Sequence, residues 1–434
     1  MVNVSNKKLQ PRVPPSNKYC FTKGGETMKT KNPNIIPEGF YRKGYKIKIY
    51  PTEAQCNYID RCIELSAFVY NWTLDTISDN YTKFLNGETD KKFLSEFDLQ
   101  HLLSEYRNEN IWLQDITLTM GRYQIRNALR AFEGYFKHRT KRPKYKSKKK
   151  SKKFIFLRPE RFYFEDNMLR IEGLPFGDKI YTGWHSNYHK KDNIEYVTPQ
   201  ITRTNLGEYF VSFCLIRRKP VEYFEEQKIE PMQSAIGIDL NVKDRFVCSN
   251  GYRSGSPNID SLIRKEKKYN KICQKDYKRR RKQEISNPDN ARISNRAIKR
   301  LNRYRKNYKK IQDTIDTFIQ QETKKIINMH PTAIVMEHLS VHGMEKVARH
   351  KSHTGKHIHH AKFYQCRRTM QNKCNKYNIP FILAPKTYPS SQLCSNCGNR
   401  KKIYTSKTYI CPVCGLRIDR DLNAAINLKK LAYE

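Results

Sequence analysis

The sequence predicts a multidomain α+β protein, in which a helical and β-barrel half is followed by an α/β domain that carries a small zinc-binding ribbon. First, strand-like segments separated by Asn, Gly and Asp fill residues 154–218 and predict an antiparallel barrel. Second, two short apolar strands, at 235–239 and 332–337, each end in an acidic residue, as strands do in α/β folds that collect a site at one sheet edge. Third, two CxxC pairs stand near the C-terminus.

The charge of the chain predicts a polyanionic partner. The sequence has 434 residues, enough for two or three domains, and its 84 Lys and Arg against 42 Asp and Glu give a net charge of +42. Such a charge destabilises a compact state unless a polyanion neutralises it, so we expect a nucleic acid, with an anionic membrane as the distant alternative. No apolar run is long enough to span a membrane and no signal-like segment begins the chain, so we expect no membrane partner and an intracellular protein.

The first half of the chain is predicted in three parts. Residues 1–40 are basic and lack periodicity, so we expect a disordered arm. Residues 45–50 alternate as a half-buried strand that completes the barrel, and the barrel domain spans 41–220. Thr52 and Gln55 form a capping-box pattern that predicts a helix start. Apolar residues then recur at helical spacing, so a helical lobe from about 52 to 140 is inserted in the barrel domain.

Basic residues at helical spacing and in one dense block are candidate nucleic-acid contacts. Three arginines follow one another at four-residue steps in a predicted helix, although a solvated basic face is an equal alternative. The polycation at 137–153 gains by counterion release on a nucleic acid, and a plain linker is its alternative. A long polar helical pair at 262–328 carries further cations. The candidates are Arg122, Arg126, Arg130, Lys144, Lys146, Lys148, Arg279, Arg280 and Arg303.

Three carboxylates are candidates for catalysis. Asp239 and Glu337 each follow a buried strand, and Asp421 stands at the start of a predicted helix. A carboxylate that leaves an apolar run is costly to desolvate unless it meets a metal or a cation, although Asp239 could instead cap a turn. Hard oxygen ligands suit Mg²⁺ or Mn²⁺, and two such ions about 3.5–4 Å apart promote in-line displacement at phosphorus. The implied reaction is phosphodiester hydrolysis.

Four cysteines predict a structural Zn²⁺ site in a ribbon at about 390–416. Cys394 and Cys397 form one pair, Cys411 and Cys414 form the other, and thirteen residues separate the pairs. Each pair is followed by glycine, as a tight metal-binding turn requires, whereas a redox dithiol needs a single CxxC in a βαβ setting. The histidines between 350 and 360 lack apolar periodicity, so we expect a mobile basic loop there rather than a metal site.

These motifs resemble those of a known family. Gly237-Ile-Asp239-Leu, Met336-Glu337-His, the two CxxC pairs and Asp419-Arg-Asp421-Leu-Asn-Ala-Ala are similar to the RuvC segments and inserted zinc ribbon of TnpB proteins. TnpB proteins are transposon-encoded, RNA-guided nucleases related to compact type V CRISPR effectors and to Fanzor proteins. The segments 47–55, 143–147 and 209–213 also resemble the N-terminal half of that family, so the resemblance covers about residues 43–430.

The resemblance implies a fold, a site and partners. It implies an RNase H-like RuvC nuclease domain at 221–434, an oligonucleotide-binding-like wedge barrel and a helical recognition lobe. These would hold a transposon-end (omega-type) guide RNA and target DNA, double- and single-stranded, beside a short flanking motif. Asp239, Glu337 and Asp421 would be the catalytic acids, and Asp421 is preferred to Asp419 because the family's acid stands two residues before Asn. The protein would lie in the cytoplasm with the nucleoid in a prokaryote, or in the nucleus if its origin is eukaryotic or viral.

Three alternatives remain at this stage. A nuclease-inactive, guide-dependent repressor of the same fold would lose one or more RuvC acids, whereas all three are present here. A zinc-ribbon transposase could also use an acidic triad, and a zinc-ribbon transcription factor would need no acids at strand ends. The sequence departs from the family at His338, where Asp is frequent, and in the histidine-rich loop, which stands where the family carries a lid. The flanking motif, the cut positions and the number of protein molecules on one RNA stay open.

Overall fold

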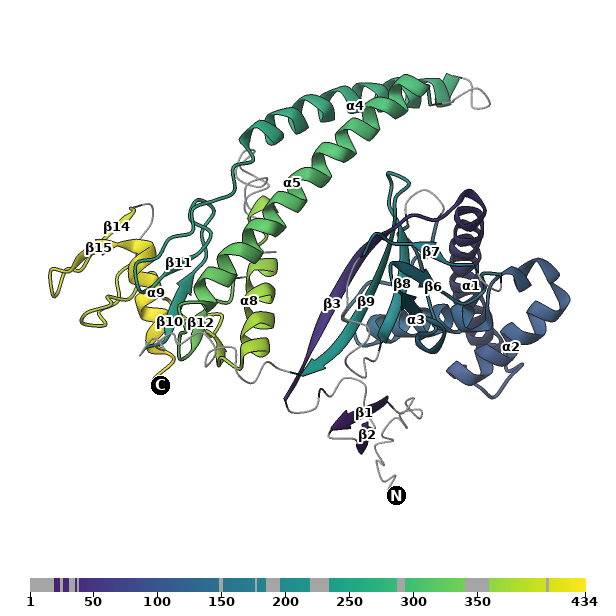
Figure 1. The fold of residues 1–434 in the computed structure, drawn as a ribbon, viewed down its shortest axis with the longest axis horizontal. Helices are drawn as coiled ribbons and strands as arrows, with labels where there is room; N and C mark the ends of the chain where they lie inside the picture. The colour runs from purple at the N-terminus through teal and green to yellow at the C-terminus, as the bar shows by residue number, and fades with distance from the viewer. Residues whose placement is uncertain are drawn as a thin grey trace. The chain divides into compact units, whose positions relative to one another are not determined.

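The structure is a computed structural model that divides into two compact units, Met1–Arg218 and Lys219–Glu434, each described here by itself (Figure 1). The residues it describes are 19–23, 26–30, 36, 39–147, 151–175, 178–184, 196–218, 234–286, 293–339, 359–402 and 406–434.

Apart from a two-stranded hairpin at residues 19–30, two antiparallel sheets form the β part of the first unit. The larger sheet consists of β3 (Phe40–Ile49), β4 (Lys153–Phe156), β8 (Tyr196–Arg203) and β9 (Tyr209–Arg218). Their spatial order is β3-β9-β8-β4. The smaller sheet consists of β5 (Tyr163–Glu165), β6 (Met168–Arg170) and β7 (Ile180–Tyr181), in that order.

The predicted barrel is therefore open in the part of the chain that the structure describes. A bridge between Tyr50 and Tyr181, with an N···O distance of 2.8 Å, joins the two sheets where the expected barrel would continue its ladder. The strand predicted at 45–50 begins earlier, at Phe40, because the whole of β3 pairs with β9. Tyr209, Val211 and Phe213 on β9 are buried at alternate positions, which fixes the register of the sheet.

Helices cover the sheets of the first unit. These are α1 (Glu53–Leu85), α2 (Glu96–Glu109), the 3₁₀ turn η1 (Ile111–Asp115) and α3 (Leu118–Phe136). The predicted capping box is confirmed: the Thr52 hydroxyl accepts from the Gln55 N–H at 3.4 Å, and the Gln55 side chain accepts from the Thr52 N–H at 3.1 Å.

The basic arm departs from its prediction between residues 19 and 30. Two strands, β1 (Tyr19–Lys23) and β2 (Glu26–Thr30), pair there as an antiparallel hairpin. The sequence between them is Gly24-Gly25, a hairpin signal that periodicity alone does not detect.

A mostly parallel sheet organises the second unit. It consists of β10 (Ile236–Asp239), β11 (Val247–Cys248), β12 (Ile334–Met336) and β13 (Phe381–Leu383). The order is β11-β10-β12-β13, with β10, β12 and β13 parallel and β11 antiparallel to β10. The helices are α4 (Asp260–Ser286), α5 (Asn295–Ile327), α8 (Phe363–Tyr377) and α9 (Arg420–Lys430). Among the described residues, no helix is long and apolar enough to cross a membrane.

The two faces of this sheet pack against different helices. Ile236, Ile238 and Met336 belong to one buried cluster with apolar residues of α5 and α8, whereas Val335 packs with Leu428 of α9 on the opposite face. Figure 1 accordingly shows β10 and β12 between α9 and the pair α5 and α8. The sheet is therefore the middle layer of three, which places the ends of its strands beside the start of α9.

Gly237 determines how closely α9 approaches the sheet. A Cβ atom built on Gly237 would lie 2.0 Å from the carbonyl oxygen of Ala425 and 2.4 Å from the backbone nitrogen of Lys429. Glycine is the residue that permits such a close approach between two backbones. The second half of α9, from Ala425 to Lys429, is thereby held against β10.

Candidate active site and zinc site

Three acidic residues meet at one edge of the parallel sheet. Asp239 is the last residue of β10, and Glu337 directly follows β12. Ile238 and Met336 are partners in the parallel register, so the two acids leave adjacent strands at the same level. Asp421 lies in the first turn of α9 and completes the group.

The pKa values of the two strand-end acids report this proximity. Burial, and then the carboxylates of Glu337 and Asp421, hold the pKa of Asp239 well above its usual range. Burial also raises the pKa of Glu337 to about 7, although the Leu240 N–H opposes the shift by donating to its Oε1 at 2.8 Å. Carboxylates that disfavour one another's charge are the arrangement that a divalent cation stabilises.

Asp421 and its neighbour Asp419 have different surroundings. The Asp421 carboxylate accepts from the Asn241 amide at 2.5 Å and from the Arg420 guanidinium at 3.0 Å. Asp419 is the N-cap of α9, and its Oδ1 accepts from the backbone N–H groups of Asp421 and Leu422, each at 3.0 Å. Burial acts to raise the pKa of Asp419, but these amides and the guanidinium of Arg253 outweigh it and lower the pKa.

The donor set of the acids fits a hard divalent cation such as Mg²⁺ or Mn²⁺. It consists of carboxylates from β10, β12 and α9, which are the ligands that these ions prefer. The carboxylate oxygens of the three acids lie farther apart than the cysteine sulfurs. Within the described residues, the four cysteines form the one group of three or more His, Cys, Asp or Glu residues whose ligand atoms all lie within 4.8 Å of one another. Asn241 and Arg420, which sequence analysis missed, hold the side chain of Asp421.

The four cysteines form a compact thiol cluster. The Sγ atoms of Cys394 and Cys414 are 3.5 Å apart, as are those of Cys397 and Cys411. A tetrahedral Zn²⁺ with bonds of about 2.3 Å requires sulfurs about 3.8 Å apart, so the residues fit this ion. The hairpin of β14 (Thr408–Ile410) and β15 (Arg417–Asp419) leads from this cluster into α9.

Two buried asparagines connect the cysteine cluster to the helix that carries Asp421. Asn423 accepts from the Ser395 N–H at 2.9 Å and donates to the Leu393 carbonyl at 2.6 Å. Asn427 donates to the carbonyls of Leu393 and Ser390 at 2.8 and 2.9 Å. Both side chains are essentially inaccessible to solvent, so the Asn-Ala-Ala-Ile-Asn pattern serves to clamp the ribbon onto α9.

The predicted nucleic-acid contacts have different surroundings in the structure. Five are exposed, namely Arg122, Arg130, Lys144, Arg279 and Arg303. Arg126 pairs with Glu96 at 2.7 Å, and Arg280 pairs with Glu284 at 2.5 Å. Lys148 lies outside the described residues.

Lys146 is placed differently from the prediction. Its ammonium lies 4.0 Å from the ring centroid of Tyr70 and 5.3 Å from that of Phe154, and it donates to Gln124 Oε1 at 2.7 Å. Burial lowers its pKa to about 8. Lys146 therefore anchors its segment inside the unit. The sequence could not predict this, because Lys146 stands in a polycation whose pattern does not distinguish inward from outward side chains.

The histidine-rich loop lies outside the described residues except at its end. His359 is 3.2 Å from the Tyr308 hydroxyl, and His360 is buried 3.8 Å from Glu266. Neither belongs to a metal-ligand group among the described residues.

Two family profiles match parts of the chain. A "Cas12f1-like, TNB domain" profile matches residues 363–428, which span α8, the cysteine cluster and most of α9. A "Helix-turn-helix domain" profile matches residues 41–85, which form β3 and α1 in this structure.

Similar proteins span most of this chain. A putative RNA-guided DNA endonuclease of Streptomyces pristinaespiralis is 24% identical over 89% of this chain and 88% of its own length. The putative RNA-guided DNA endonuclease InsQ of Escherichia coli K12 is 22% identical over 89% of this chain and 91% of its own length. TnpB-like protein L770 of Acanthamoeba polyphaga mimivirus is 22% identical over 99% of this chain and 80% of its own length. A solved Cas12f1–sgRNA–target DNA complex aligns with 90% of this chain and 99% of that chain, at 14% identity and a TM-score of 0.49.

Proposed function

The chain belongs to the TnpB family, and we propose that it is an RNA-guided DNA endonuclease that hydrolyses phosphodiester bonds. The observation that carries the proposal is the meeting of Asp239, Glu337 and Asp421 at the edge where β10 and β12 end and α9 begins. Acids at this edge would form a RuvC-type site, and two of the relatives reported above are named as putative RNA-guided DNA endonucleases.

The three acids would hold Mg²⁺ or Mn²⁺. When bound, such ions supply an activated water and stabilise the charge on the leaving oxygen. The chain's own groups set the positions of the ligands: the Leu240 N–H orients Glu337, and Asn241 with Arg420 orients Asp421. The N-cap Asp419 fixes the first turn of α9 and with it the backbone of Asp421.

The guide would be an omega-type RNA from a transposon end. The net charge of +42 supports a large nucleic-acid partner. Exposed cations on the long helices α4 and α5, such as Arg279 and Arg303, would contact backbone phosphate. Base pairing with the guide would select the target, while the protein would recognise a short flanking motif in double-stranded DNA and hold the displaced single strand.

The test begins with the RNA that copurifies with the protein. That RNA should be a defined species, and the loaded protein should cut a matching DNA target in Mg²⁺ but not in EDTA. Asp239→Ala and Glu337→Ala should each abolish cutting and leave guided binding nearly unchanged, because each removes a metal ligand and little packing.

The outcomes separate the alternatives. Retained cutting by either variant would contradict the assignment of the acids. A loaded protein that binds its target and never cuts in Mg²⁺ is a repressor, and an RNA-free protein that joins DNA ends is a transposase. The clustering of all three acids favours cutting over repression, because a protein that only binds has no use for mutually repelling carboxylates.

A further inference from the structure

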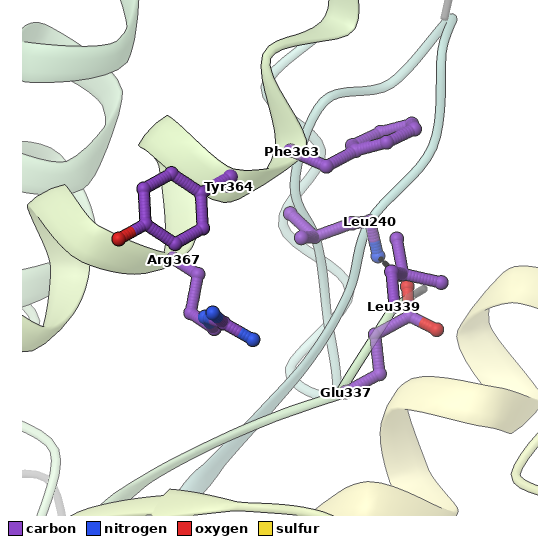
Figure 2. A pocket seen from close by; sticks show the side chains of 6 residues that line it. All are labelled: Leu240, Glu337, Leu339, Phe363, Tyr364 and Arg367. Atoms are coloured by element: carbon purple, nitrogen blue, oxygen red, sulfur yellow. Dashed lines mark hydrogen bonds between the residues drawn. The ribbon is translucent and has the colours of Figure 1, made fainter. Parts of the chain in front are cut away.

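A small pocket opens beside Glu337, between the strand ends and α8 (Figure 2). On the strand side it is bounded by a hydrogen bond from the Leu240 N–H to the Glu337 carboxylate. Figure 2 shows two side chains of α8 across the pocket from that carboxylate. The lining residues are Leu240, Glu337, Leu339, Phe363, Tyr364 and Arg367.

Two polar members of this lining stand three residues apart, on one face of α8. The Tyr364 side chain is 57% exposed, whereas its neighbour Phe363 is 2% exposed and belongs to the core. The Arg367 guanidinium lies 5.3 Å from the centroid of the Tyr364 ring. An exposed aromatic ring beside a guanidinium offers a flat face on which a nucleobase can stack and N–H donors for a phosphate.

The guanidinium of Arg367 carries the positive charge of this face. Among the ion pairs of the described residues, none joins Arg367 to a carboxylate, although Glu337 lies in the same pocket. Guanidinium groups bind phosphate through paired N–H donors, and an unpaired one next to an acid cluster is placed to do so.

We propose that Tyr364 and Arg367 bind the DNA strand that enters the acid site. The Tyr364 ring stacks on a nucleobase, and Arg367 pairs with the backbone phosphate adjoining the phosphate that is cut. Every nucleobase offers a flat face and every link a phosphate, so this contact orients the strand without selecting its sequence. The inference rests on the proposed nuclease function and adds a strand-binding site to it.

The first experiment uses the guide-loaded full chain and separates binding from cutting. Tyr364→Ala and Arg367→Ala should each slow single-turnover cleavage by about ten- to hundredfold, the scale of one stacking contact. Guided binding of the target, followed by gel shift, should stay within about twofold, because base pairing dominates it. Tyr364→Phe should cut at the wild-type rate, and Arg367→Lys should recover part of it. Arg368→Ala is the matched control, because Arg368 is the exposed neighbour on the same helix.

The second experiment locates the contact on the substrate. An abasic site or a neutral methylphosphonate is moved one position at a time along the cleaved strand. At one position, the abasic site should slow the wild-type protein but not Tyr364→Ala, and at one position the methylphosphonate should slow the wild-type protein but not Arg367→Ala. If these residues act only in packing, each substrate modification should slow the alanine variants by the same factor as the wild-type protein at every position.

The failures are distinguishable. A wild-type protein that does not cut in Mg²⁺ refutes the proposed nuclease. A wild-type protein that cuts, with both alanine variants equally fast or with multiplicative effects everywhere, overturns the strand-binding site and leaves the nuclease intact.

Discussion

Two neighbouring acids of α9, Asp419 and Asp421, show how the surroundings of a side chain separate structural from chemical roles. Asp419 accepts two backbone N–H groups of the first helical turn and pairs with Arg253 at 2.6 Å. Asp421 makes the larger of the two residues' contributions to the electrostatic field that raises the pKa of Asp239. The residues are two positions apart and have the same chemistry, so their roles follow from position in the fold.

We therefore expect different defects from substitutions at these two positions. Asp421→Asn should abolish cleavage at nearly unchanged stability, because the amide keeps the contact to Arg420 geometrically but is a poor metal ligand. Asp419→Ala should lower the free energy of unfolding by about 1 kcal/mol, the value of a lost N-cap, and retain part of the cleavage. Denaturant melts and cleavage rates of both variants check this, and a stable, inactive Asp419→Ala would reverse the assignment.

Lys146 provides a pH-dependent prediction at the same scale. Its pKa falls from 10.5 to about 8 on folding, so between these values the unfolded chain binds more protons than the folded one. Stability of the wild-type protein should therefore rise with pH across this window, by up to about 3 kcal/mol relative to Lys146→Met, which lacks the proton. Urea melts of both proteins at pH 7.5 and pH 10 measure the difference. An equal response of both proteins to pH would show that the ammonium is not buried as described.

Among the elements, α9 connects the acid edge with the ribbon that holds the four cysteines. Its inward face carries Asn423 and Asn427 toward the ribbon, and its backbone lies against Gly237 of β10. The helix therefore transmits any shift of the ribbon or of β10 to Asp421.

Gly237→Ala should displace α9. The new methyl group would need the space occupied by the Ala425 carbonyl, 2.0 Å away, and backbone atoms move less easily than side chains. We expect a loss of at least about 2 kcal/mol of stability, as for severe overpacking, and at least tenfold slower cleavage. Gly251→Ala is a control for general loss of glycine, since no atom lies within 4 Å of its Cβ position and the cost there arises from its φ of +88° alone. Equal cleavage by Gly237→Ala and the wild-type protein would contradict the close packing.

Removal of zinc should act through the same helix. Chelation, or Cys394→Ser, should make the segment around 390–416 sensitive to protease, because structural zinc binding is coupled to folding. Cleavage of DNA should fall as well, since the Ser395 N–H bonded to Asn423 belongs to the first cysteine turn. Limited proteolysis with mass analysis of the fragments tests this, and unchanged protection of the ribbon after verified zinc loss would refute it.

At the scale of the whole molecule, the excess of 84 basic over 42 acidic residues governs how nucleic acid is held. Binding through phosphate contacts weakens linearly in log affinity against log salt concentration, with a slope set by the number of contacts. Guided binding should combine this term with base pairing, which depends less on the protein's charge.

Substitution of exposed arginines on the long helices measures how many phosphate contacts these helices make. Arg279→Ala and Arg303→Ala should each reduce the salt slope of RNA binding by about one and weaken all RNA sequences alike. Gln274→Ala, an exposed neutral change on α4, is the control. Titrations at several salt concentrations measure the slopes, and a slope identical to that of the wild-type protein would remove these helices from the interface.

Several features were predictable because neighbours in sequence create them. The capping box of Thr52 and Gln55, the two cysteine pairs, and the acids that end β10 and follow β12 depend on local spacing and patterning. The sequence by itself therefore determined the four clustered cysteines, the strand-end acids and the basic character of the chain.

Only the tertiary structure decided which residues of the same type are buried, which form ion pairs and which face the acid site. It turned Lys146 inward to Tyr70, paired Arg126 with Glu96, and placed Tyr364 and Arg367 opposite Glu337. The physical reason is that burial and pairing depend on partners distant along the chain, and a lysine, an arginine or an aspartate has the same local pattern whether it faces protein, solvent or a substrate.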